Sequence, residues 1–466
     1  MNTSTTKDYE NFLLQYPAYG STSHLDALRE NEFSRLDDHK HVYVDFVGAN
    51  LYPDLLVHQH AEFLTANTYG NPHSSNPTSK LATHHVETAR QAVKDYFNDI
   101  ADEYAVIFTA NASGALKLVG ESYPFDTNSC LLMVADNHNS VNGLREFARS
   151  KGAPFIYAPI HEETMQVKAG ELQNNLASNI TGNKLFAYPA QSNFSGIKHD
   201  LSWIEKAQAS GWDVLLDAAA FVPGNVLDLS IHKPEFVSIS FYKMFGYPTG
   251  IGCLLAKRSA LRKMNRPWFA GGTIEVASVR GDGHYLADNE AGFEDGTVNF
   301  LGIPAVANGL LFLKNIGIDS IQSRTRALTD WTLKQLLAMH HSTGKPLCHL
   351  YGTSDINHRG ATITVNILDE NGDWVFYEDV EQDANSLGIS LRSGCFCNPG
   401  ADETANSIAS EMLRPIFESG NKITYAQFVE MARGRFVVGA VRVSFGYISN
   451  VADAYAIVSF FKRYIK

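Results

Sequence analysis

The sequence of 466 residues is long enough to form one large and one smaller domain, each with a buried core. Hydrophobic residues make up 44% of the chain, a fraction that is ordinary for a globular protein. The formal net charge of −12 argues against nucleic acid and against an anionic membrane surface as partners.

The cysteines follow neither the spacing of a disulfide scaffold nor that of a zinc site, so we expect free thiols and no metal. The first residues contain no apolar segment of the kind found in signal peptides, and no apolar run reaches the length of a membrane span. We therefore expect a cytoplasmic protein without a membrane partner. The cysteines are Cys130, Cys253, Cys348, Cys395 and Cys397.

Residues 1–39 are polar and favour helices, and we interpret them as an N-terminal arm that packs on the rest of the chain. The alternating run at residues 42–47 predicts a strand that leads into a turn. Apolar residues at helical spacing predict a long helix over residues 79–97.

From residue 104 onward, short apolar runs alternate with helical segments such as 140–151 and 201–210. This alternation predicts a mostly parallel sheet with crossover helices. The predicted strands are 104–109, 130–135, 154–158, 184–190, 214–219 and 236–241, and a further apolar run covers 251–256.

A predicted helix over residues 303–316 leads into a second domain, in which residues 362–367 and 440–445 are predicted strands. We therefore expect an α/β fold with a large domain over residues 40–305. A small α+β domain over residues 306–466 is expected to include the N-terminal arm.

Lys243 lies between two apolar runs that are typical of core strands. Lysine is rarely buried, so its side chain either reaches solvent at the strand end or acts as an amine that forms a Schiff base. Asp217 ends a preceding predicted strand and favours the second interpretation, because lone acids at the carboxyl ends of parallel strands belong to sites in α/β folds. An enzyme that uses pyridoxal 5′-phosphate (PLP) needs this pair, the lysine to bind the cofactor and the aspartate to keep its ring nitrogen protonated.

Two stretches carry a resemblance to a known family. They are Ser-Phe-Tyr-Lys-Met-Phe-Gly-Tyr-Pro-Thr-Gly at residues 240–250 and Arg-Ser-Gly-Cys-Phe-Cys-Asn-Pro-Gly-Ala at residues 392–401. In them the chain resembles the class V branch of fold-type I PLP enzymes, which includes the cysteine desulfurases. It is most similar to the desulfurase domain of molybdenum-cofactor sulfurases. The resemblance extends from about residue 43 to the C-terminus and implies the fold of a fold-type I PLP transferase.

The resemblance implies which residues hold the PLP phosphate. Ala112 and Ser113 match two of these positions, although an ordinary helix N-cap explains their small-residue loop equally well from the sequence alone. Ser240 and Tyr242 match two others. Most cysteine desulfurases have histidine where this chain has Tyr242, and a tyrosine hydroxyl can still donate to a phosphate oxygen.

Other matches concern the cofactor ring and the neighbouring subunit. His138 matches the residue that stacks on the PLP ring and handles protons, and Asn193 matches one near the 3′ oxygen and the substrate. The sequence alone explains the first as a satisfied polar residue and the second as a turn residue. Thr297 matches a residue that reaches the cofactor phosphate of the partner subunit, which implies a homodimer; its sequence pattern alone predicts only a turn.

Arg442 is a charge inside a β-prone run. It is either an edge-strand residue that faces water or a planar, bidentate donor for a substrate carboxylate, and the resemblance favours the substrate role.

Cys397 matches the cysteine that forms a persulfide in the desulfurases, and Cys395 is the second candidate. A thiol in a mobile Gly/Pro-bounded loop near a cation such as Arg392 is typical of a reactive cysteine. A Cys-x-Cys metal site is the alternative, and no further ligand cluster supports it. The molybdenum-cofactor sulfurases usually have a further cysteine where this chain has Asp402.

We therefore expect a PLP-dependent cysteine desulfurase, a sulfurtransferase that converts L-cysteine to alanine and leaves a persulfide for a sulfur acceptor. Lys243 and His138 would move protons, and Cys397 would attack the substrate sulfur. The alternative is a PLP-dependent lyase or transferase that acts on another amino acid. It gains weight because the sulfurases carry an additional C-terminal domain, whereas this sequence ends at Lys466. An inactive scaffold with this fold is disfavoured because the chain retains both the lysine and the cysteine.

Overall fold

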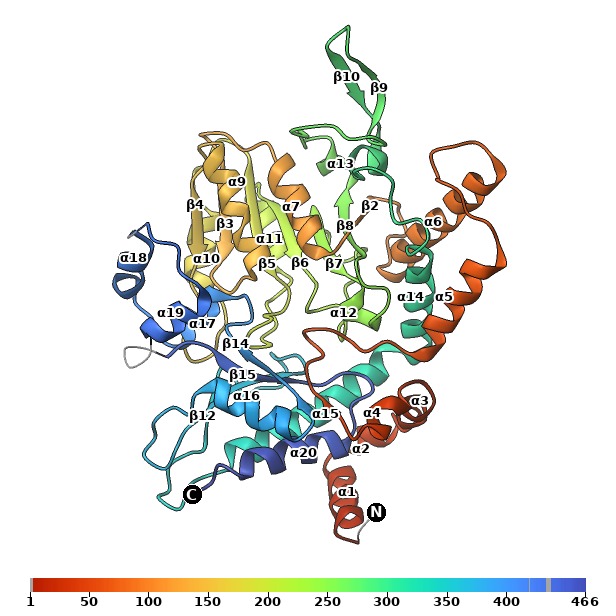
Figure 1. Ribbon diagram of the computed structural model, residues 1–466. Helices are drawn as coiled ribbons and strands as arrows, with labels where there is room; N and C mark the ends of the chain where they lie inside the picture. The colour runs from red at the N-terminus through yellow and green to blue at the C-terminus, as the bar shows by residue number, and fades with distance from the viewer. Residues whose placement is uncertain (1–2, 419, 433–436) are drawn as a thin grey trace.

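The structure is a computed structural model that describes residues 3–418, 420–432 and 437–466. Residues 1–2 of the predicted arm, and residues 419 and 433–436 of the predicted small domain, lie outside the described residues. A large sheet with its helices forms the upper part of the molecule in Figure 1, and a smaller sheet with its helices forms the lower part. None of the described helices is long and apolar enough to cross a membrane.

The large sheet has seven strands in the order β2-β8-β7-β6-β5-β3-β4. Only β8 runs antiparallel to its neighbours, and all the other pairs are parallel. The strands are β2 (Tyr104–Thr109), β3 (Cys130–Val134), β4 (Phe155–Ala158), β5 (Lys184–Pro189), β6 (Asp213–Asp217), β7 (Phe236–Ser240) and β8 (Gly252–Lys257).

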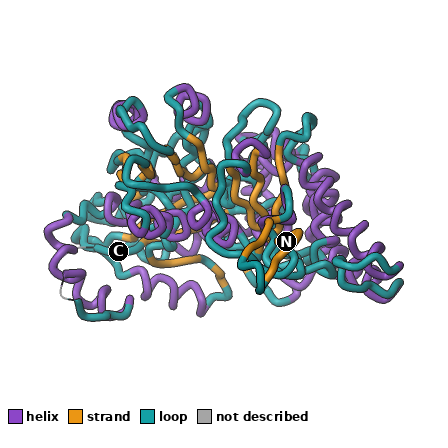
Figure 2. Tube along the Cα trace, turned by 90° about the horizontal axis from the view of Figure 1, so that it is seen from above, coloured by secondary structure: helices purple, strands orange, loops and turns teal. Residues whose placement is uncertain are grey.

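Both faces of the large sheet are buried, because successive residues of a strand point to opposite faces and both sets are apolar. In β5, for example, Phe186 and Tyr188 pack in one core, whereas Leu185 and Ala187 pack in the other. Figure 2 shows the strands in the interior with helices around them. One face is covered by α5 (Asp54–Ala66), α6 (Pro77–Tyr96), α10 (Ala169–Leu176), α11 (Trp203–Ala209) and α14 (Pro304–Ile316), and the other by α7 (Ala112–Ser122), α8 (Asn139–Asn142), α9 (Leu144–Ser150) and α13 (Arg258–Leu261).

The smaller sheet is antiparallel, with the order β11-β12-β15-β14. Its core also contains Phe12 and Tyr19 of the N-terminal arm, and the ring of Phe12 packs against those of Tyr19 and Trp331. The strands are β11 (Cys348–Leu350), β12 (Thr362–Ile367), β14 (Arg392–Gly394) and β15 (Ala440–Ser444). The helices of this part are α15 (Ile318–Leu337), α16 (Tyr377–Ser386), α17 (Pro399–Ala405), α18 (Ser410–Glu418), α19 (Tyr425–Ala432) and α20 (Val451–Lys462), and those of the arm are α1 (Thr3–Gln15), α2 (Pro17–Gly20), α3 (His24–Glu32) and α4 (Ser34–Asp38).

Three differences from the sequence-based expectation concern the neighbourhood of the large sheet and the turn that follows residue 43, and the short strands β11, β13 (Ile389–Ser390) and β14 were not predicted either. The strand predicted over residues 42–47 is only β1 (Val42–Tyr43), which pairs with β13, because the chain turns after Asp45. The helix predicted over residues 140–151 is divided at Gly143 into α8 and α9. A hairpin that the sequence analysis did not predict, formed by β9 (Ile274–Ser278) and β10 (Gly283–Leu286), projects at the top of Figure 1. The short 3-10 helix η1 (Asn289–Phe293) follows it in the sequence.

Candidate active site

Polar side chains gather where neighbouring strands of the large sheet end. His138 follows β3, Asn193 follows β5, Asp217 ends β6 and Ser240 ends β7. These strands are parallel, so their carboxyl ends meet at one edge of the sheet, which is where open α/β sheets bind ligands. The sequence therefore folds so that distant segments supply one site.

A cavity of about 140 Å³ lies at this edge. It brings together all the residues that we predicted to bind the cofactor, with the exception of Thr297. Its lining residues are Asn111, Ala112, Ser113, Leu116, His138, Ser140, Pro189, Gln191, Asn193, Asp217, Ala219, Ala220, Ser240, Tyr242 and Lys243.

Lys243 lies in the single turn α12 (Tyr242–Phe245), directly after β7. Gly246 ends this turn with φ 79°, and a side chain there would collide with the backbone of Leu51. The close approach lets Asn50 donate a hydrogen bond from Nδ2 to the carbonyl of Lys243 at 2.7 Å. The backbone around the lysine is thus fixed from two sides.

The amine of Lys243 is suited to covalent chemistry. Burial lowers its pKa, Asp217 opposes that shift, and Arg442 adds to it. Among the residues that the structure describes, no hydrogen bond or ion pair engages Nζ of Lys243. A desolvated lysine of this kind is the amine that a Schiff base requires.

Asp217 and His138 complete the polar lining. Oδ1 of Asp217 accepts hydrogen bonds from the Ala219 backbone and the Ser238 hydroxyl, both at 3.1 Å. Its Oδ2 has no hydrogen-bond partner in the described part of the chain. Nδ1 of His138 accepts from the Ser140 backbone at 3.1 Å, so the neutral ring carries its proton on Nε2. Burial lowers the pKa of His138, which favours this neutral form.

The amino end of α7 supplies a place for an anion. Asn111 caps this helix by accepting from the Gly114 backbone, and the Ala112 backbone donates to Ser240 Oγ at 2.8 Å. The hydroxyls of Ser113 and Ser140 share a hydrogen bond of 2.6 Å. A helix of eleven residues presents a positive dipole end there, beside donors that suit a phosphate group.

These groups fit PLP. The cavity offers an unpartnered amine for the aldehyde, a free carboxylate oxygen for the ring nitrogen, an imidazole for the ring face and a capped helix end for the phosphate. In residues 3–418, 420–432 and 437–466, no group of three or more histidine, cysteine or acidic side chains is arranged to hold a metal ion.

Arg442 reaches the site from the smaller sheet. Its strand β15 lies between β12 and β14, and its side chain is 3% exposed, so the alternative of an edge-strand arginine facing water is wrong. It donates to the Asn193 carbonyl at 2.6 Å and to Oδ1 of Asp45 at 2.8 Å, and its buried Nε has no partner among the described residues. Arg392 binds the other oxygen of Asp45 at 2.6 and 2.8 Å. One carboxylate therefore connects both arginines.

Our sequence analysis missed Asp45. The sequence feature that could have identified Asp45 is its position as an acid inside the alternating apolar run of residues 42–47. Arg442, a charge inside a β-prone run, was identified from the same kind of feature. An acid in such a run needs a partner, because a buried carboxylate without one is costly.

The segment Gly394–Asn398, which we call the cysteine loop, is fixed to the rim of the cavity. Phe396 and Cys397 both have positive φ angles, 54° and 56°, in the left-handed region that few residues adopt. Asn193 Nδ2 donates to the Phe396 carbonyl, and the Asn139 backbone donates to the Cys397 carbonyl, both at 2.6 Å. The predicted mobility of this loop is therefore limited by hydrogen bonds in the structure.

The two cysteines of the loop differ in environment. Cys397 is exposed, whereas Cys395 is half-buried. Burial raises the pKa of Cys395, and the nearby carboxyl of Asp402 raises it further. Arg392 lies close enough to Cys397 for the two to interact electrostatically. The surroundings therefore disfavour a thiolate on Cys395 and leave Cys397 as the accessible thiol of the loop.

A second acid that sequence reasoning did not use, Asp136, holds the cysteine loop in place. It is fully buried and accepts hydrogen bonds from Ser192 Oγ at 2.8 Å and Asn398 Nδ2 at 2.6 Å, and it pairs with His199 at 3.1 Å. Asn398 also donates to Asn193 Oδ1 at 3.0 Å. The sequence feature that could have identified Asp136 is its position directly after the predicted strand 130–135, two residues before His138.

Thr297 does not line this cavity. It is exposed in the segment after η1, and its hydroxyl accepts a hydrogen bond from Asn71 Nδ2 at 3.2 Å. Its contribution to a partner subunit's site stays a prediction.

Comparison with known proteins adds a family and a fold. The family model for aminotransferase class-V matches residues 42–455. The chain is 37% identical to a molybdenum cofactor sulfurase from Solanum lycopersicum over 99% of its own length and 60% of that protein. It is also 37% identical to the human molybdenum cofactor sulfurase over 95% of its length and 51% of the relative. The chain thus spans only about half to three-fifths of these curated relatives.

Solved structures show the same fold. A cysteine desulfurase from Thermococcus onnurineus superposes with a TM-score of 0.77 at 21% identity, covering 94% of this chain and 97% of that one. A cysteine desulfurase from Escherichia coli superposes with a TM-score of 0.73 at 19% identity, covering 94% and 98%. The predicted fold class, a fold-type I α/β architecture with a mostly parallel large sheet, is confirmed.

Proposed function

Because the chain belongs to the aminotransferase class-V family, whose members depend on PLP, we propose that it is a cysteine desulfurase. It would remove the sulfur of L-cysteine, release alanine and hold the sulfur as a persulfide on Cys397 for transfer to an acceptor. The observation that carries the proposal is the cysteine loop, which two hydrogen bonds of 2.6 Å fix to the residues beside His138 and to Asn193.

The residues of the cavity divide the work of holding the cofactor. The amino end of α7, with Ser113 and Ser240, would bind the phosphate, and Oδ2 of Asp217 would hold the protonated ring nitrogen. His138 would lie against the ring, and Lys243 would bind the cofactor covalently. When bound, PLP withdraws electrons from the α-carbon of the substrate.

The substrate would be oriented by its carboxylate. Arg442 has a buried Nε without a partner among the described residues, and its guanidinium already bridges Asp45 and the Asn193 carbonyl. A substrate carboxylate would bind the free Nε of Arg442 and would compete with Asp45 for the terminal N–H groups of the same guanidinium. Lys243, with its lowered pKa, would take the α-proton as a neutral amine.

The thiolate of Cys397 would attack the substrate sulfur. A sulfur–sulfur bond then forms while the carbon–sulfur bond breaks, its electron pair stays on the carbon, and a proton completes alanine. Arg392 stabilises the attacking thiolate by its charge.

The experiment compares two variants of the same loop with L-cysteine as substrate. Cys397→Ala should keep the yellow colour of the bound cofactor, yet its alanine formation should fall to background. Cys395→Ala is the matched control, since it changes the same volume in the same loop and should retain most of the alanine formation. A PLP-dependent lyase, the alternative, would give pyruvate and ammonia and would need neither thiol. Full turnover in both variants would reject the desulfurase.

We also infer a cytoplasmic homodimer. The free cysteines support a reducing compartment, and the exposed Thr297, which does not line the cavity of its own chain, supports a role toward a partner's site.

A further inference from the structure

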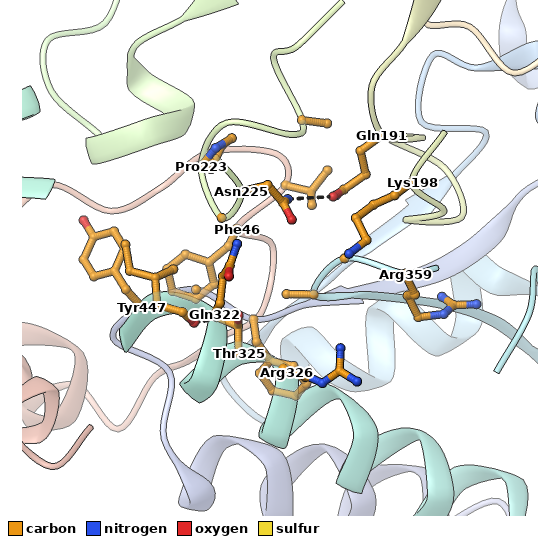
Figure 3. Close-up of a pocket in the computed structure, with 18 of the residues that line it drawn as sticks. Phe46, Gln191, Lys198, Pro223, Asn225, Gln322, Thr325, Arg326, Arg359 and Tyr447 are labelled. Atoms are coloured by element: carbon orange, nitrogen blue, oxygen red, sulfur yellow. Dashed lines mark hydrogen bonds between the residues drawn. The ribbon is translucent and has the colours of Figure 1, made fainter. Parts of the chain in front are cut away.

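A second cavity lies between the two domains, beside the cavity of Lys243 (Figure 3). We call it the interdomain cavity; its volume is about 160 Å³. Gln191 and Ala220 line both cavities, so the two are neighbours. Asn50, which donates to the Lys243 carbonyl, also lines the interdomain cavity. Arg442, the expected partner of the substrate carboxylate, does not line it.

The charged residues that line the interdomain cavity are all basic. They are Lys198, Arg326 and Arg359, and no aspartate or glutamate occurs among its described lining residues. The chain as a whole carries a net charge of −12, so basic composition does not explain this arrangement. A cavity wall that contains basic side chains and no acidic ones has a positive electrostatic potential, which favours the binding of anions.

Arg359 is a buried cation without a countercharge. It is 2% exposed, and its guanidinium donates only to backbone carbonyls, at distances of 2.7 to 3.0 Å. Burial lowers its pKa to about 10. A guanidinium held in this way keeps its full charge, and no carboxylate among the described residues balances it.

Lys198 is the cation that points into the cavity. Figure 3 shows its side chain extending from the chain after β5 into the space faced by Gln322 and Thr325 of α15. No hydrogen bond or ion pair of its ammonium group occurs in the described part of the chain. Burial lowers its pKa, and the charge of Arg326 lowers it further.

The positive charge of Arg326 is only partly compensated by its neighbours. It donates to the carbonyl of Ile356 and to Asn357 Oδ1, at 3.4 and 2.7 Å. The exposed Asp355 interacts with it electrostatically but does not line the cavity.

Uncharged groups of the lining add hydrogen-bonding capacity. Asn225 donates to Gln191 at 3.3 Å, the interaction drawn in Figure 3. Oδ1 of Asn50 is buried and has no partner among the described residues, so it accepts from a protonated group of a ligand or from water. Gln322 supplies a further donor on the opposite wall, whereas the Thr325 hydroxyl donates to the Ile321 carbonyl at 2.8 Å and can only accept. The cavity therefore has the composition of a polar binding site rather than of a packing defect.

We propose that the interdomain cavity binds a small organic anion, one that carries a carboxylate or a phosphate group, with Lys198 as its principal ligand. The anion supplies the countercharge that Lys198, Arg326 and Arg359 lack, and a partly desolvated ammonium forms strong, charge-assisted hydrogen bonds. Since Gln191, Ala220 and Asn50 connect the cavity to that of Lys243, the bound anion lies beside the catalytic centre without occupying the substrate position.

The test measures binding to the PLP-loaded protein by titration calorimetry, with inorganic phosphate and malonate as probes. Loading with PLP keeps phosphate out of the cofactor site, and L-cysteine is left out, so the result does not depend on the proposed reaction. We expect at least one probe to bind, and its identity separates phosphate from carboxylate ligands. Lys198→Met should weaken that binding about tenfold, because it removes a charge-assisted hydrogen bond. Lys198→Arg should retain it.

Two further variants sharpen the result. Lys168→Met removes a half-buried lysine that does not line the cavity and should bind like the wild type. Gln322→Glu is nearly isosteric and places a negative charge on α15, so it should abolish binding even if Lys198→Met folds poorly. The proposal is overturned if neither probe binds at about 10 mM, a concentration at which even weak sites fill, or if Lys198→Met and Gln322→Glu both bind as the wild type does.

Discussion

At the scale of single residues, the site is a set of charges that nearly balance, all of them buried or partly buried except Arg392. Lys243 is affected by the acids Asp217 and Asp45 and by the arginines Arg442 and Arg392. Because acids and bases oppose one another around the amine, burial is the largest influence on its pKa and lowers it. The balance lets the amine lose its proton without leaving another charge uncompensated.

Lys243→Ala should abolish the visible absorbance of the bound cofactor, since Lys243 is the only lysine among the described residues that line the cavity. PLP should then bind only through noncovalent contacts and should be lost on dialysis. Absorption spectra before and after dialysis, with PLP added in excess, measure this. Lys198→Ala, which changes a lysine of the neighbouring cavity, is the matched control and should stay yellow. A colourless wild type after PLP addition would contradict the cofactor assignment.

Asp45→Asn should destabilise the fold by about 3 kcal/mol, because it leaves the buried Arg442 without its countercharge. The change preserves the shape of the side chain, so the loss reports charge. Denaturant unfolding at neutral pH measures it. Asp54→Asn is the control, since its pair with Arg35 is only partly buried and should contribute about 1 kcal/mol or less. Equal losses of unfolding free energy in the two variants would show that the ion pair between Asp45 and Arg442 stabilises the fold no more than the pair between Asp54 and Arg35.

At the scale of elements, the strands of the large sheet could be predicted because each is a continuous apolar run between turn residues. β2, β5 and β7 begin at the predicted residues and end within one residue of the predicted ends. Strands buried on both faces require such runs, so the pattern and the fold have one physical cause. The residues at the ends of the strands were predictable for the same reason, since a polar residue after a buried run is conspicuous.

Elements that depend on distant contacts could not be predicted. The hairpin of β9 and β10 is almost entirely exposed, so burial imposes no pattern on its sequence. The short β1 and the cysteine loop are set by Asp45 and Asp136, whose partners lie hundreds of residues away. A pattern read along the chain contains no information about such pairs.

Helix α17, directly after the cysteine loop, contains the buried acid Asp402. Burial raises the pKa of Asp402 to about 7, whereas the pKa of an aspartate in an unfolded chain is about 3.9. Between these values the folded protein binds more protons than the unfolded chain, so stability falls as pH rises through the window and the loss is complete above it. The charged carboxylate thus destabilises the fold at neutral to alkaline pH.

Asp402→Asn should remove this dependence, since asparagine resembles the protonated acid. At pH 8 the variant should be more stable than the wild type by as much as about 4 kcal/mol, and at pH 4 the two should be similar. Unfolding curves across this range measure the difference. A constant difference at all pH values would mean that Asp402 titrates in the same range in both states.

At the scale of the whole molecule, the site is shared between the two main sheets. The large sheet supplies the cavity, and the smaller sheet supplies Arg442 and leads into the cysteine loop. Asn193 connects them, because its carbonyl accepts from Arg442 and its side chain donates to Phe396. A change in the relative position of the two sheets would therefore move Arg442 and the cysteine loop together.

Thr297 extends the question to a second copy of the chain. Thr297→Ala should weaken retention of PLP roughly thirtyfold if its hydroxyl donates to a cofactor phosphate, since one such hydrogen bond contributes about 2 kcal/mol. The covalent chemistry of Lys243 should be unaffected, so the visible spectrum at saturating PLP should match that of the wild type. Thr343→Ala, an exposed threonine of the small domain, is the control and should retain PLP normally.

Mixed dimers distinguish a contribution to the partner's site from one to the same chain. A Lys243→Ala chain paired with a Thr297→Ala chain forms one complete site only if Thr297 acts across the interface, because the intact lysine and the intact threonine then belong to different chains. We therefore expect one tightly bound PLP in each mixed dimer and none in the Lys243→Ala dimer. If Thr297 acted within its own chain, every site of the mixed dimer would be defective and PLP would be lost on dialysis. A monomer in light scattering would exclude the shared site altogether.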